Sequence, residues 1–79
     1  MAKLPSDNDK ARMALDVFQH FGTRPNEVIM QQNVMAVSVQ RGWRHEDLVD
    51  GLKIAADRGW VEDGPNGTIR LTEDGFAQV

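Results

Sequence analysis

The stretch RGWVEDGPNGTIRLTEDGF, residues 58–76, decides the fold of this chain. Two short runs, residues 60–63 and Thr68–Leu71, alternate apolar and polar side chains on either side of a Gly/Pro/Asn cluster at 64–67. The cluster ends in an Asn-Gly pair, which tolerates the positive φ angles that a tight hairpin turn needs. The stretch therefore predicts a two-stranded β-hairpin. The side chains expected to point inward are Val61, Ile69 and Leu71.

Helical patterns flank the hairpin on both sides. Upstream, apolar residues at helical spacing predict a helix from about His45 to Arg58, which Gly59 ends. Downstream, Thr72 is placed to cap a final helical turn that begins with acidic residues, as the positive end of a helix dipole favours. The apolar stripe of the upstream helix consists of Leu48, Val49, Leu52, Ala55 and Ala56.

The N-terminal part of the chain predicts another helix over Asp7–His20. Ser6 is a good N-cap, and acidic residues follow it in the first turn. Apolar residues then recur at helical spacing up to Phe21, and Gly22 stops the helix. We expect residues 1–5 to be a short mobile lead-in.

The middle segment is harder to interpret. Pro25 suits the first position of a helix, and apolar residues after it cover more than half of a helical circumference. This predicts a buried central helix that runs from Pro25 to the residue before Gly42. Because residues 34–40 are rich in β-branched side chains, a strand there remains an alternative.

Composition limits the class of protein. The chain has 79 residues, enough for one domain with a thin core, and its net charge is −3. It has no cysteine, which excludes disulfides and thiolate chemistry. The N-terminus has no apolar signal region, and the apolar runs are far shorter than a membrane span needs. We therefore expect a soluble cytoplasmic protein that does not bind membranes.

The sequence does not point to an enzyme. The two histidines, His20 and His45, lie in different predicted elements, and no nucleophile with a partner base is evident. The run His45-Glu46-Asp47 cannot converge on one metal, because consecutive helical residues point in different directions. No phosphate-binding or dinucleotide motif occurs. We expect no catalytic residue, no metal and no cofactor.

The order of elements and one motif resemble a known family. The stretch DRGWVEDGPNGTIRLTEDGFA resembles the wing region of winged helix-turn-helix regulators of the MarR and PadR type, in which a helix ends at a Gly-aromatic step and the second wing strand leads into an LT..G cap. The corresponding residues here are Arg58-Gly59-Trp60-Val61 and Leu71-Thr72-Glu73-Asp74-Gly75. The resemblance implies an α+β fold, mainly helical: three helices, a two-stranded hairpin wing and a short C-terminal turn. It also implies a bacterial DNA-binding module of transcription regulation.

By this resemblance, the start of the helix after Arg44 would read base edges of double-stranded DNA. The turn QRGWRH places four polar or basic residues together, and these could contact phosphates or purines. We expect Trp43, in the same turn, to anchor the core. The candidate nucleic-acid-binding residues are Gln40, Arg41, Arg44 and His45, with Lys53 and Arg70 in support.

A protein partner is the alternative. On the helix from about His45 to Arg58, the face opposite Leu48 and Leu52 is predicted to carry four acids and two bases, which would repel phosphates. An apolar residue, Ile54, lies among these acids, and such a surface would suit a basic protein. Ile54 could equally pack under a terminal segment. The residues of this alternative interaction surface are Asp50, Ile54 and Asp57.

Overall fold

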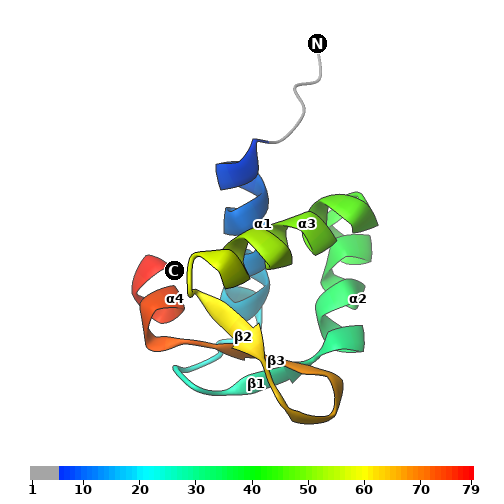
Figure 1. The fold of residues 1–79 in the computed structure, drawn as a ribbon. Helices are drawn as coiled ribbons and strands as arrows, with labels where there is room; N and C mark the ends of the chain where they lie inside the picture. Colours follow the sequence, from blue (N-terminus) through cyan, green and yellow to red (C-terminus); the bar gives the residue numbers. More distant parts are fainter. Residues whose placement is uncertain (1–5) are drawn as a thin grey trace.

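The computed structural model describes residues 6–79. In this part of the chain an α+β fold is formed by four α-helices and one three-stranded antiparallel sheet (Figure 1). The expected mobility of residues 1–5 lies outside the described residues. In chain order the elements are α1 (Asp7–His20), β1 (Val28–Met30), α2 (Gln31–Arg41), α3 (His45–Asp57), β2 (Val61–Asp63), a 3-10 turn (Pro65–Gly67), β3 (Thr68–Leu71) and α4 (Glu73–Gln78).

Two helices begin at the caps that the sequence predicts. At α1, the Ser6 side chain accepts a hydrogen bond from the Asp9 amide, and the Asp9 carboxylate accepts one from the Ser6 amide. At α4, the Thr72 hydroxyl accepts a bond from the Gly75 amide and also donates to the Trp60 carbonyl. These bonds satisfy amides that a helix start otherwise leaves unpaired. The cap at Thr72 in addition ties α4 to the chain segment that follows α3.

The prediction for residues 25–30 was wrong. The helix does not begin at Pro25; this region forms a turn and then strand β1, and α2 begins only at Gln31. Asn26 adopts a positive φ of 69°, which interrupts any helix. The burial pattern of Val28, Ile29 and Met30 is exposed, buried, exposed, the alternation of a strand with one face on the core.

Strand β1 enlarges the predicted hairpin to a three-stranded sheet with the order β1-β3-β2. Ile29 pairs with Ile69, and Val61 pairs with Leu71, so the inward residues of all three strands meet on one side. The inward positions predicted for Val61, Ile69 and Leu71 are confirmed, because all three are buried. The third strand was missed because a three-residue strand carries too little alternation to be recognised next to a helix.

Residues 34–40 are helical, which excludes the strand alternative. Val34, Val37 and Ser38 are buried and follow the i, i+3, i+4 spacing of one helix face. The Ser38 hydroxyl donates to the Met35 carbonyl at 2.6 Å, so this buried polar group is satisfied within the helix. Val34 and Val37 therefore face the core of the domain from a helix, whereas Val39 faces solvent.

Helix α3 lies directly against α1, and this contact fixes its orientation. Gly51 is buried in the middle of α3, and a Cβ atom there would lie 2.7 Å from the carbonyl carbon of Lys10. The two backbones can approach this closely only because Gly51 has no side chain. Phe18 of α1, Leu48 of α3 and Leu71 of β3 are fully buried and form the centre of the core.

Helices α2 and α3 both end at the tripeptide Arg-Gly-Trp. It occupies residues 41–43 at the end of α2 and residues 58–60 at the end of α3. In each case the glycine is left-handed, with φ of 69° at Gly42 and 77° at Gly59, and the Trp amide donates back to the helix. Each Trp packs against the core, and the preceding Arg lies over its ring, with 5.4 and 5.1 Å between guanidinium carbon and ring centroid. The same cap therefore ends both α2 and α3, and its two Trp side chains pack on the core just before and just after α3.

Candidate nucleic-acid interface

The turn between α2 and α3 brings four of the predicted site residues together. Gln40 and Arg41 are the last two residues of α2, Arg44 directly precedes α3, and His45 is its first residue. All four are exposed. Trp43, between them, is half-buried and packs on the core, as we expected for a core anchor. The turn therefore presents polar and basic side chains to solvent around an aromatic anchor.

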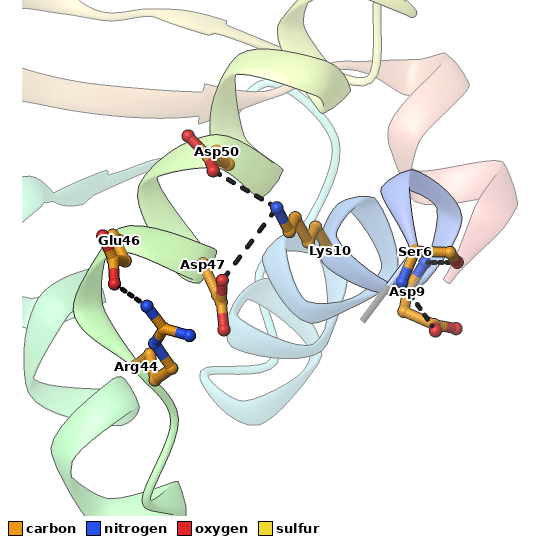
Figure 2. A network of polar contacts seen from close by, with 7 residues as sticks. All are labelled: Ser6, Asp9, Lys10, Arg44, Glu46, Asp47 and Asp50. Atoms are coloured by element: carbon orange, nitrogen blue, oxygen red, sulfur yellow. Dashed lines mark hydrogen bonds and ion pairs between the residues drawn. The ribbon is translucent and has the colours of Figure 1, made fainter. Parts of the chain in front are cut away.

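Arg44 is already paired within the molecule. Its guanidinium forms an ion pair and a hydrogen bond with Glu46, on the first turn of α3 (Figure 2). This hydrogen bond, with the negative charges of Glu46 and Asp47, raises the pKa of Arg44 above its ordinary value. Both side chains are more than half exposed, so the pair is open to water and can exchange Glu46 for another anion.

Lys53 and Arg70, the two supporting residues, lie apart from the turn. Lys53 is exposed on the second half of α3. Arg70 lies on β3, and its guanidinium donates to the Glu62 carboxylate on β2 at 3.2 Å. Of these two cations, only Lys53 is without an acidic partner among the described residues.

An open groove lies between α3 and the β2–β3 hairpin, and the sequence did not reveal it. It has a volume of about 530 Å³ and is bordered by the start of α2. A second hollow of about 440 Å³ continues it and adds His45 and the hairpin residue Asn66. Of the predicted site residues, only Lys53 and His45 line these hollows. The residues that contribute an apolar lining to the first hollow are Met35, Val49, Leu52, Ala56, Val61 and Ile69.

The groove was missed because one wall depends on an unpredicted element. The start of α2 borders it, and α2 begins there only because residues 28–30 form β1. The sequence did contain a partial signal. Val49 and Ala56 lie at the edge of the apolar stripe of α3, and the structure leaves Val49 half-buried and Ala56 exposed.

The predicted acidic surface of α3 is only partly open to solvent. Lys10 of α1 lies 3.3 Å from the Asp50 carboxylate and 4.0 Å from that of Asp47, and Figure 2 shows its ammonium group between the two. Ile54 is partly buried, whereas we expected it to face outward. The reason is the crossing at Gly51, which places α1 beside this part of α3. Asp57 is exposed, as expected.

Residues 6–79 contain no group of three or more His, Cys, Asp or Glu side chains arranged to hold a metal ion. Within the same residues, no helix has the length and apolar character that crossing a membrane requires.

Comparisons with known proteins gave no relative. No protein-family model matches the chain. No curated protein matches its sequence, and no solved structure matches its fold. The interpretation of the interface therefore depends on its own geometry.

Proposed function

We propose that this chain is a winged-helix module that binds double-stranded DNA and acts in transcription regulation. The observation that carries the proposal is the connectivity. A helix, a strand and two further helices lead into a hairpin, and β1 completes the sheet beside β3. This is the layout expected of a winged helix, with α3 as the groove-reading helix and the β2–β3 hairpin as the wing.

The internal ion pairs support this proposal. The strongest argument against DNA was the number of acids on α3, since like charges would repel phosphates. Two of these four acids, Asp47 and Asp50, are paired with Lys10 of α1, a cation that the proposed phosphate contacts do not use. Lys10 and Asp47 are largely buried, so solvent screens that part of the cluster less than an exposed pair. The repulsion is therefore smaller than the sequence suggested.

The starts of α2 and α3 provide a second line of support. Among the described helices, α1 and α4 have side-chain caps, whereas α2 and α3 have none. The first residues of both uncapped helices, Gln31 and His45, line the second hollow. Amides at a helix start that lack an acceptor favour anions such as phosphate. In the proposed mechanism, Arg41 and Arg44 anchor the backbone of one strand, and the start of α3 approaches the bases.

The test is a titration with a fluorescent random-sequence duplex at several salt concentrations. The wild-type chain should bind at low salt and lose affinity as salt rises, because binding releases counterions. The double variant Arg41→Ala/Arg44→Ala should bind more weakly. Its slope of log affinity against log salt should be shallower by roughly 0.9 for each phosphate contact removed.

The matched control is Arg24→Ala/Arg58→Ala, which removes the same charge from exposed arginines outside the turn. Its salt slope should stay at the wild-type value. Equal losses in the two double variants would show that only net charge matters and would refute the assignment of the turn. Absence of binding by the wild type at low salt would refute the proposed function itself.

The alternative surface, Asp50, Ile54 and Asp57, has less support. Asp50 is held by Lys10, and Ile54 is partly buried, so only Asp57 is fully available to a basic protein. An Ile54→Asp variant that folds normally but loses a protein partner would restore this alternative.

A further inference from the structure

The side of α3 that faces the hairpin is apolar, which is unusual for a helix that is to read DNA. Every α3 residue that lines the hollows lies within one strip of the helix surface. At roughly 100° per residue, this strip covers less than a third of the circumference of the helix. These residues are His45, Val49, Leu52, Lys53 and Ala56. The strip holds one lysine, one histidine and no acid; the two acids that line the first hollow, Glu62 and Asp63, lie on β2, and Glu62 is paired with Arg70. The centre of the strip, at Val49 and Ala56, can contact a partner only through methyl groups.

Duplex DNA offers one apolar group to such a strip. In the major groove, thymine presents an O4 acceptor and a C5 methyl group, whereas guanine, cytosine and adenine present hydrogen-bonding groups and no methyl group. Valine and alanine side chains have no hydrogen-bonding atoms, so over a G·C pair they would leave donors and acceptors unsatisfied. An A·T pair also presents hydrogen-bonding groups, but over it these side chains would in addition bury the thymine methyl group.

Two side chains at the start of α2 have the hydrogen-bonding groups to recognise an A·T pair. Gln31 lines both hollows, Gln32 lines the second, and both residues are exposed. A glutamine amide can donate and accept at once, which matches the N6 and N7 groups of adenine. Lys53 and His45 lie on the strip with Val49, where the Lys53 ammonium group can meet a phosphate beside the bases and the His45 ring can donate a hydrogen bond.

We propose that Val49 and Ala56 determine specificity by contacting thymine methyl groups, so that the module selects A·T-rich duplexes. This inference depends on the proposed DNA binding and adds the class of sequence to it. The two residues contribute little to overall affinity, which comes from phosphate contacts, but they decide which duplex is bound most tightly.

The experiment compares two A·T-rich duplexes of the same sequence, one with thymine and one with deoxyuridine, which lacks the methyl group. The wild type should bind the thymine duplex more tightly, by roughly fourfold for each buried methyl group. A G·C-rich duplex of equal length should bind more weakly than both. All three affinities are measured at one salt concentration by fluorescence anisotropy.

In the variant Val49→Ala, the ratio of the affinity for the thymine duplex to the affinity for the uracil duplex should fall towards one. The salt dependence of binding should stay as in the wild type. The matched control is Val39→Ala, since Val39 is an 81% exposed helical valine that lines neither hollow. The ratio of the two affinities in this control should equal that of the wild type. Thermal denaturation confirms that both variants are folded.

The outcomes separate the two proposals. Salt-dependent binding with equal affinity for thymine and uracil duplexes would overturn the methyl readout and leave the proposed function intact. Absence of salt-dependent binding to every duplex would overturn both proposals and would favour a protein as the occupant of the groove.

Discussion

The close contact of α1 and α3 makes Gly51→Ala a sharp test of the fold. In a helix, alanine is about 1 kcal/mol more favourable than glycine, so helix propensity alone predicts that the variant is more stable. The new Cβ atom, however, would lie 2.7 Å from the carbonyl carbon of Lys10 and closer still to its oxygen. Optimal separations between carbon atoms are about 3.5–4.0 Å, so the two backbones must separate by roughly 1 Å.

Separation of this kind in a packed core costs about 1–3 kcal/mol. Because the clash involves backbone atoms that cannot rotate away, the upper part of this range applies, about 2–3 kcal/mol. The gain of about 1 kcal/mol in helix propensity offsets part of this cost, so the free energy of unfolding should fall by about 1–2 kcal/mol. For a domain of this size the Tm should fall by roughly 5–15 °C, measured by circular dichroism. The control Ala36→Gly, at an exposed position of α2, measures helix propensity alone and should cost about 1 kcal/mol. A Gly51→Ala chain as stable as the wild type would refute the packing argument.

Two further variants test other contacts. Thr72→Ala removes the cap of α4 and should destabilise the domain by about 1 kcal/mol in thermal unfolding, whereas Thr72→Ser keeps the hydroxyl group and should retain most of the stability. Lys10→Gln leaves Asp47 and Asp50 without their cation and should therefore weaken duplex binding, although Lys10 lines neither hollow beside the hairpin. Arg12→Gln removes the same charge from the same helix without freeing a carboxylate, and an equal loss of affinity in this control would contradict the explanation.

Strong local patterns allowed most elements to be predicted. The bounds of α1 and β3 and the cap at Thr72 agree with the structure, and β2 begins one residue later than predicted, because each depends on neighbouring residues such as a cap or an alternating run. Strand β1 was missed because what makes Val28–Met30 a strand is the free edge of β3, some 40 residues later in the chain. Pairing of this kind is tertiary, and it overrides the helical preference that Pro25 suggested.

The candidate site was predictable only in part, and for a similar reason. The residues of the α2–α3 turn are neighbours in sequence, so their proximity followed from the turn itself. The charge that α3 presents to solvent did not follow, because it depends on Lys10, which reaches Asp47 and Asp50 from α1. The groove also required the relative positions of α2, α3 and the hairpin, which no local pattern contains.

The distribution of charge has a consequence for selectivity if the chain binds DNA as proposed. Arg70 is paired with an acid, Arg44 has to release Glu46 before it can bind a phosphate, and the net charge is −3, so few cations are free to neutralise phosphates. Since phosphate contacts supply nearly all non-specific affinity, binding to random DNA should be measurable at low salt and weak at physiological salt. What determines occupancy of a target is the ratio of specific to non-specific affinity. In a module with few phosphate contacts, the small gain in affinity from thymine methyl contacts at Val49 and Ala56 would therefore be a larger part of the total binding free energy than in a strongly basic domain.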